Sequence, residues 1–185
     1  FILGTRARKT RTKSMNAFSS IDYPDVALIR DGRILHYILQ GKPPMPPVFH
    51  DKLDANVFVL RLIPGMNPDV LRPLANRFDA LVIESFGVGG LPCYEQADFL
   101  SAASAWSSAG KPIVITTQVP HEGSDLAVYQ VGARVAAQPG ILQAYTMTAE
   151  AVVTKLMWIL PQTRDLAQIK RLFYTPIACD LLLFE

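Results

Sequence analysis

Beyond residue 54 the sequence alternates short, continuously apolar runs with longer amphipathic stretches, and this alternation limits the possible folds more than any other feature. The apolar runs predict buried strands at residues 57–62, 80–83 and 113–117. The amphipathic stretches predict helices at residues 68–78, 95–109, 125–137, 149–160 and 164–173, with N-caps expected at Asn67, Ser124, Thr148 and Thr163. Buried strands that alternate with helices are typical of a parallel sheet covered on both faces. We therefore predict a three-layer, Rossmann-like α/β domain over residues 54–185.

The N-terminal part of the chain has a different character. Residues 26–29 and 33–37 are β-prone runs on either side of Asp31-Gly32, a pair that favours a hairpin turn. Four of the five residues 43–47 are proline, which cannot join a helix or a central strand. We therefore expect residues 41–53 to form an extended linker.

The basic residues are unevenly distributed. The net charge is only +2, yet residues 1–20 carry five basic residues and no acidic one, which leaves 13 basic and 16 acidic groups in the rest. Such a basic run suits either a nucleic-acid arm or a solvated segment that docks on a partner. Because no aromatic residue lies between residues 6 and 13 to stack on bases, we favour the docking segment and expect no nucleic-acid partner.

The number of cysteines, the spacing of histidines and the length of the apolar runs disfavour several classes of protein. Two cysteines, Cys93 and Cys179, cannot form a disulfide framework or a four-cysteine zinc site. The three histidines lack metal-ligand spacing, so we expect neither a metal nor a cofactor. The apolar runs are far shorter than the roughly 18 residues of a membrane span, and no signal peptide is recognisable. We therefore expect a cytoplasmic protein without a membrane partner.

Three loops, at residues 63–68, 85–92 and 118–124, follow the predicted strands. The carboxyl ends of parallel strands lie along one edge, so these loops should converge where ligands of such domains bind. The second loop carries the sequence G-V-G-G at residues 87–90, which suits either a dinucleotide site or a tight turn against another backbone. Its spacing departs from G-x-G-x-x-G, which favours the turn. In the third loop, Glu122 is either a polar group in a site or part of a surface loop.

A series of short motifs extends along nearly the whole chain. They are Arg8-Lys9-Thr10-Arg11-Thr12-Lys13-Ser14, Asn16-Ala17-Phe18, Glu84-Ser85-Phe86-Gly87-Val88-Gly89-Gly90-Leu91-Pro92, Thr116-Thr117-Gln118, Gly123-Ser124-Asp125-Leu126 and Met147-Thr148-Ala149-Glu150-Ala151 with Thr154-Lys155-Leu156. In order and spacing these motifs resemble the C-terminal part of cytoplasmic, type I-like L-asparaginases. The resemblance implies that residues 1–40, which open at Phe1 like the inside of a strand, end an N-terminal catalytic domain, and that the chain is a piece of a longer enzyme.

The resemblance also implies a function. Enzymes of this family hydrolyse L-asparagine to L-aspartate and ammonia through a nucleophilic threonine. The nucleophile and its helpers lie in T-G-G-T and H-G-T-D-T segments that these 185 residues do not contain. We therefore expect no catalytic residue in this chain and no activity from it alone.

The expected contribution of the chain follows from the family's dimer, in which the C-terminal domain of one subunit reaches the catalytic domain of its neighbour. The resemblance places Ser85, Gly89 and Gly90 on this neighbouring-subunit side of the site for L-asparagine or a related amide, in a homodimer or homotetramer. Periplasmic relatives also use a glutamate in the next loop, and Glu122 lies nearby without matching its position. We expect Glu122 on the same side of the site. Related enzymes often have asparagine at the position of Gly90, so a direct side-chain contact is lost there. An arginine and a cysteine that bind an effector in some type I enzymes appear here as Glu84 and Val119, which argues against the same effector chemistry.

Two other interpretations remain open. The chain could be a non-catalytic binding or oligomerisation module of the same fold, because its strand and helix pattern is self-sufficient from residue 54 onward. A nucleotide-binding half-domain rests only on the glycine-rich loop. A tRNA-dependent amidotransferase subunit also has an asparaginase-like fold, but nothing in the linker or the C-terminus supports an added tRNA-contacting domain.

Overall fold

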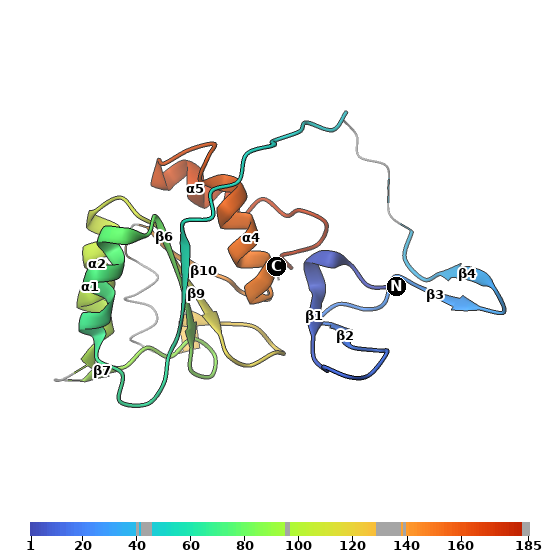
Figure 1. The fold of residues 1–185 in the computed structure, drawn as a ribbon, viewed down its shortest axis with the longest axis horizontal. Helices are drawn as coiled ribbons and strands as arrows, with labels where there is room; N and C mark the ends of the chain where they lie inside the picture. The colour runs from blue at the N-terminus through green and yellow to red at the C-terminus, as the bar shows by residue number, and fades with distance from the viewer. Residues whose placement is uncertain (40, 42–45, 95–96, 129–137, 139, 183–185) are drawn as a thin grey trace.

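The computed structural model describes residues 1–39, 41, 46–94, 97–128, 138 and 140–182. Its main body is an α/β domain, and a smaller N-terminal part lies beside it (Figure 1). Among the described residues, no helix is both long and apolar enough to cross a membrane.

The α/β domain is built on a four-stranded parallel sheet with the strand order β10-β9-β6-β5. The strands are β5 (Val57–Arg61), β6 (Ala80–Ser85), β9 (Ile113–Thr117) and β10 (Ile141–Gln143). In register, Val57 lies opposite Ala80, and Leu81 lies opposite Ile113. The two central strands, β6 and β9, are buried along their whole length, which explains why their sequences are continuously apolar up to Ile83 and Ile115.

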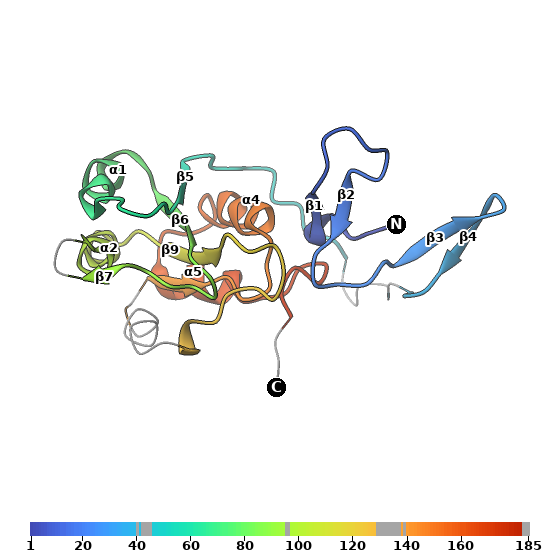
Figure 2. The same cartoon turned by 90° about the horizontal axis from the view of Figure 1, so that it is seen from below.

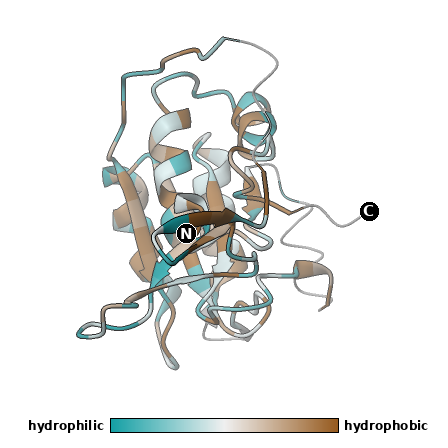
Figure 3. Cartoon of the chain, turned by 90° about the vertical axis from the view of Figure 1, so that its right-hand side faces the viewer, coloured by the Kyte–Doolittle hydropathy of each residue, from teal (hydrophilic) through white to brown (hydrophobic). Residues whose placement is uncertain are grey.

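Helices cover both faces of this sheet. The four helices with described bounds are α1 (Leu71–Arg77), α2 (Phe99–Ser108), α4 (Ala149–Ile159) and α5 (Leu166–Phe173). Figure 1 shows α1 and α2 on one side of the sheet and α4 and α5 on the other, and Figure 3 shows helices that carry both hydrophobic and hydrophilic residues. Successive residues of a strand belong to two hydrophobic cores, one on each face of the sheet. Val82 packs in the core on the α4 side, and Leu81 packs in the core on the α2 side. The predicted three-layer α/β fold is confirmed.

The helix starts depend on capping groups, some of which were predicted. Asn67 caps the expected first helix by accepting the Asp69 N–H at 2.9 Å, although its first turn, η2 (Pro68–Val70), is a 3-10 turn. Thr148 caps α4 by accepting the Ala151 N–H at 3.2 Å, as expected. Thr163 is not the cap of α5; that position belongs to Asp165.

The prediction was wrong at the start of α2. The helix begins at Phe99, not at residue 95, because the Asp98 carboxylate accepts the N–H groups of Leu100 and Ser101. A short antiparallel pair, β7 (Cys93–Tyr94) and β8 (Ala97–Asp98), precedes it.

Two further regions differ from the prediction or lie beyond it. Strand β10 was not predicted, because three residues are too short for a recognisable pattern. Most of the helix expected at residues 125–137 lies outside the described residues. Its described beginning is a 3-10 turn, η3 (Leu126–Val128), and the Ser124 hydroxyl donates to the Tyr145 carbonyl at 3.5 Å instead of capping a helix.

The N-terminal part holds a 3-10 turn and two antiparallel pairs. The turn is η1 (Gly4–Arg6), and the strands are β1 (Ala7–Lys9), β2 (Phe18–Ser20), β3 (Ala27–Arg30) and β4 (Arg33–His36). The β3–β4 hairpin turns at Asp31 and Gly32, both with positive φ, as the sequence indicated. It extends away from the α/β domain in two perpendicular views (Figures 1 and 2).

Candidate functional site

The three predicted loops do meet at the carboxyl edge of the sheet. Gln118, just after β9, donates its side-chain N–H groups to the carbonyls of Leu62 at 2.6 Å and Glu84 at 3.0 Å. The Thr117 hydroxyl donates to the Gly87 carbonyl. These bonds tie the loops after β5, β6 and β9 into one surface.

The glycine-rich loop after β6 is a tight turn. The N–H groups of Gly89 and Gly90 both donate to the Phe86 carbonyl, at 3.0 and 2.8 Å. Gly89 has a φ of 128°, and a Cβ there would lie 2.8 Å from Leu126 Cδ2. The N–H groups of Gly89 and Gly90, which could otherwise bind a phosphate, are thus used inside the loop, and α2 begins only at Phe99. This geometry favours the tight-turn interpretation over the dinucleotide site.

Ser85 lies at the last position of β6 and is fully buried. Its hydroxyl donates to the Thr116 carbonyl at 2.6 Å. The side chain therefore joins two neighbouring strands, and a contribution to a ligand site would come through its support of the loop that follows.

Gly90 lines a cavity of about 470 Å³ between the first two loops. The other lining residues are Pro64, Gly65, Phe86, Leu91 and Pro92. These are predominantly apolar groups, with backbone atoms as the polar ones, so the cavity suits an apolar group more than a charged one.

Glu122 lies in the third loop with its side chain exposed. Its φ is 75°, an unusual value for a residue with a Cβ, and its N–H donates to Asp22 Oδ2 at 3.0 Å. The structure thus brings Ser85, Gly89 and Gly90 together in one loop and places Glu122 in a neighbouring loop of the same edge.

A charged cluster at this edge was missed by the sequence analysis. Glu84, the last residue but one of β6, is buried; its Oε2 lies 3.5 Å from Arg61 Nη1, and its Oε1 lies 3.9 Å from Nη2 of Arg8 in the N-terminal part. Arg8 also lies 3.5 Å from Glu150 of α4. An acidic residue that ends an otherwise apolar strand, together with the basic run, was the available signal.

The basic run is solvated only in part, because Lys9, Arg11 and Lys13 are exposed whereas Arg6 is 0% exposed. Its Nε donates to the Cys179 carbonyl at 2.6 Å and its Nη1 to the Thr146 carbonyl at 2.8 Å. Burial lowers the pKa of Arg6, and the charges of Asp180 and Asp22 oppose that shift. Arg6 therefore anchors the N-terminal part to the α/β domain.

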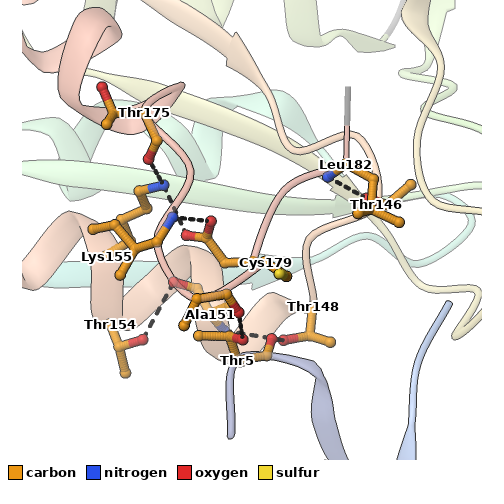
Figure 4. A network of polar contacts seen from close by, with 12 residues as sticks. Thr5, Thr146, Thr148, Ala151, Thr154, Lys155, Thr175, Cys179 and Leu182 are labelled. Atoms are coloured by element: carbon orange, nitrogen blue, oxygen red, sulfur yellow. Dashed lines mark hydrogen bonds and ion pairs between the residues drawn. The ribbon is translucent and has the colours of Figure 1, made fainter. Parts of the chain in front are cut away.

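Further contacts beside Arg6 join the two parts of the chain along a seam formed by Thr5, Arg6, Thr146, Thr148, Ala178 and Cys179. The Thr5 hydroxyl donates to the Ala178 carbonyl at 2.6 Å, and the Thr148 hydroxyl donates to the Thr5 carbonyl at 3.4 Å. Lys155 of α4 donates to the Thr175 carbonyl at 2.7 Å in the same network (Figure 4).

In the part of the chain that the structure describes, no group of three or more His, Cys, Asp or Glu residues could hold a metal ion.

Known proteins match this chain along most of its length. Residues 56–173 match the family model described as the glutaminase/asparaginase C-terminal domain. The L-asparaginase of Thermococcus kodakarensis is 41% identical over 183 residues, which are 97% of this chain and 54% of that protein. A glutamyl-tRNA(Gln) amidotransferase component from Pyrococcus furiosus is 28% identical over 182 residues, which are 96% of this chain and 40% of that protein.

Solved structures give the same result. The thermostable L-asparaginase from Thermococcus kodakarensis has a TM-score of 0.92 and 39% identity, and the match covers 99% of this chain and 55% of that one. L-asparaginase I from Vibrio cholerae shares the fold, with a TM-score of 0.82 at 23% identity over 97% of this chain and 54% of that one. The chain spans about half the length of the curated relatives it matches.

Proposed function

Because this chain belongs to the glutaminase/asparaginase C-terminal domain family, we propose that it works as the C-terminal part of an L-asparaginase. Such an enzyme would convert L-asparagine and water into L-aspartate and ammonia. The observation that carries the proposal is the 41% identity with the Thermococcus kodakarensis L-asparaginase along 97% of this chain. The amidotransferase component from Pyrococcus furiosus reaches only 28% over nearly the same residues.

In this proposal the chain builds one wall of the site and does not supply the nucleophile. A threonine outside these residues attacks the amide carbon, ammonia leaves, and water then hydrolyses the acyl-enzyme. Gly89 and Gly90 let the loop after β6 approach the substrate closely, with Ser85 holding that loop in place. The exposed Glu122 carboxylate suits the α-ammonium group of an amino-acid amide.

The assembly belongs to the proposal as well. The sheet edge of one copy would complete the site of a neighbouring copy in a homodimer or homotetramer. In this assembly the loops at the carboxyl edge contact the neighbouring copy. The proposal also predicts that the 185-residue chain alone releases no ammonia.

A chimera tests the proposal directly. In it, this chain replaces the matching residues of the Thermococcus kodakarensis enzyme, and ammonia release is measured with L-asparagine and L-glutamine. We expect hydrolysis by the chimera and none by the chain alone. Glu122→Gln should raise KM, whereas Asp25→Asn, at an exposed carboxylate outside the site, should leave the kinetics unchanged. A folded but inactive chimera, or turnover by the chain alone, would contradict the proposal.

A non-catalytic oligomerisation module is the second candidate. One observation favours it: the β3–β4 hairpin exposes Ile29 and Ile34, at 64% and 53% of their surface, on a ribbon that extends away from the domain. Sedimentation of the chain alone, taken together with the activity of the chimera, separates the candidates. A stable oligomer together with an inactive chimera would support the module.

A further inference from the structure

We propose that Asp22 is a positioning residue that fixes the loop carrying Glu122 to the N-terminal part of the chain. The inference rests on the proposed function and deepens it, because it names what sets the place of Glu122 at the sheet edge. Asp22 follows β2 in the N-terminal part, whereas the loop at residues 118–124 follows β9, a hundred residues later.

The α/β domain holds both ends of this loop. At the first end, the Gln118 N–H donates to the Ser85 carbonyl at 3.1 Å. At the last end, the Ser124 N–H donates to the Tyr145 carbonyl at 2.8 Å. Gly123 lies so close to this backbone that a Cβ would be 2.3 Å from the Tyr145 oxygen. Neither end can shift without breaking these contacts.

Asp22 holds the middle of the loop. Its Oδ2 accepts the Glu122 N–H at 3.0 Å, and its Oδ1 lies 3.2 Å from His121 Nδ1. Within the described residues, the hydrogen bonds found for His121 and Glu122 both end on this carboxylate. The left-handed backbone conformation of Glu122 is disfavoured for a residue with a Cβ. A hydrogen bond to a charged acceptor such as the Asp22 carboxylate is stronger than one between neutral groups, so it offsets part of this cost. Asp22 therefore stabilises a loop conformation that local sequence does not favour.

Asp22 is itself held in place because both of its sequence neighbours contact the seam around Arg6 and Cys179. On one side, the N–H of buried Ile21 donates to the Arg6 carbonyl at 2.9 Å. On the other side, the Tyr23 hydroxyl lies 3.5 Å from Cys179 Sγ, and the Tyr23 ring lies 5.7 Å from Arg6 Cζ. The middle of the loop is thus attached to the N-terminal part, which means that this part and the α/β domain together determine where Glu122 lies.

Amide hydrogen exchange of the 185-residue chain, followed by NMR, tests this arrangement. In Asp22→Ala the Glu122 amide should exchange about ten-fold faster or more, because it loses a charged acceptor. The Gln118 amide, which is bonded to the Ser85 carbonyl, should keep its rate and report an intact sheet edge. Asp25→Ala removes an exposed carboxylate three residues away and should change neither rate.

The conservative variant keeps the test decisive. Asp22→Asn retains an oxygen that can accept the Glu122 N–H, so its exchange rate should fall between those of the wild type and Asp22→Ala. If Asp22→Ala does not fold, the comparison of Asp22→Asn with the wild type decides. An unchanged Glu122 rate in the variants that fold would overturn the proposal.

A second readout separates this inference from the proposed function. In the chimera, Asp22→Ala should raise KM for L-asparagine by a larger factor than it lowers kcat, since Glu122 is displaced while the nucleophile is untouched. An inactive chimera would contradict the proposed function but would not affect the hydrogen-exchange evidence for the role of Asp22. An unchanged exchange rate of the Glu122 amide in Asp22→Ala, together with an active chimera, would contradict only the role of Asp22.

Discussion

Lys155 Nζ lies 2.7 Å from Asp180 Oδ2, and both side chains are only 4% exposed. The pair joins α4 to the segment that follows α5. Nζ also donates to the Thr175 carbonyl, and Asp180 Oδ1 accepts the Ile177 N–H at 2.8 Å. Burial lowers the pKa of Lys155, and the interaction with Asp180 opposes that shift without cancelling it. Desolvation therefore outweighs the attraction, as is common for buried ion pairs.

Removing one member of this pair should destabilise the chain strongly. Lys155→Met leaves the Asp180 carboxylate buried without its cation, and we expect a loss of about 3–5 kcal/mol in the free energy of unfolding. Urea denaturation at neutral pH measures this loss. The exposed Arg164 ion pair with Asp54, at 2.5 Å, is the matched control, and Arg164→Met should cost about 1 kcal/mol or less. Equal losses in the two variants would contradict the interpretation.

Asp98, the N-cap of α2, should contribute to acid sensitivity. The Ser101 hydroxyl, and then the N–H groups of Ser101 and Leu100, lower the pKa of Asp98 below its ordinary 3.8. Because the folded value is the lower one, the stability it contributes is complete above pH 3.8 and is lost as the pH falls through the folded pKa. Asp98→Asn keeps the cap and should flatten the acid limb of a plot of unfolding free energy against pH. Asp98→Ala should cost about 1 kcal/mol at neutral pH. An acid limb unchanged in Asp98→Asn would assign that limb to other carboxylates, such as Asp54.

Tyr174 should have the opposite pH dependence. Its hydroxyl accepts the Gln143 N–H at 2.9 Å and lies 3.3 Å from the Gln143 carbonyl, at strand β10. Burial raises its pKa to about 12 from 10.0. Since the folded state holds the proton more tightly, the stability from this group is present below pH 10.0 and is lost as the pH rises toward about 12.

Tyr174→Phe tests this alkaline limb. The variant should show a smaller decline above pH 10.0, and its phenolate absorbance titration should lack one step near pH 12. Because the Gln143 N–H then has no acceptor, we also expect a loss of about 1–3 kcal/mol at neutral pH. A wild-type titration that is complete well below pH 12 would contradict the assignment.

Thr148, Arg6 and strand β10 show which features the sequence could predict and which it could not. The faces of the sheet and the Thr148 cap depend on neighbours in sequence, so periodicity and capping rules identified them. Strand β10 and buried Arg6 depend on partners far away in sequence: Arg6 binds the carbonyl of Cys179 after a separation of 173 residues. No local pattern carries such information. The convergence of the three loops followed from parallel topology, but the attachment of Glu122 to Asp22 did not.

Three glycines near the sheet edge allow a graded test of the close approaches described there. An alanine Cβ at Gly123 would lie 2.3 Å from the Tyr145 backbone oxygen, at a φ of 68°, so Gly123→Ala should cost about 3 kcal/mol or more. At Gly89 the nearest atom is the end of the flexible Leu126 side chain, and the expected cost is about 1–3 kcal/mol, due mainly to the φ of 128°. At Gly90 a Cβ meets only the Phe86 carbonyl oxygen, at an ordinary 3.5 Å, so Gly90→Ala should change stability by less than about 0.5 kcal/mol. Urea denaturation of the three variants measures the order, and a Gly90→Ala variant as unstable as Gly123→Ala would show that the glycine-rich loop is packed more tightly than these contacts indicate.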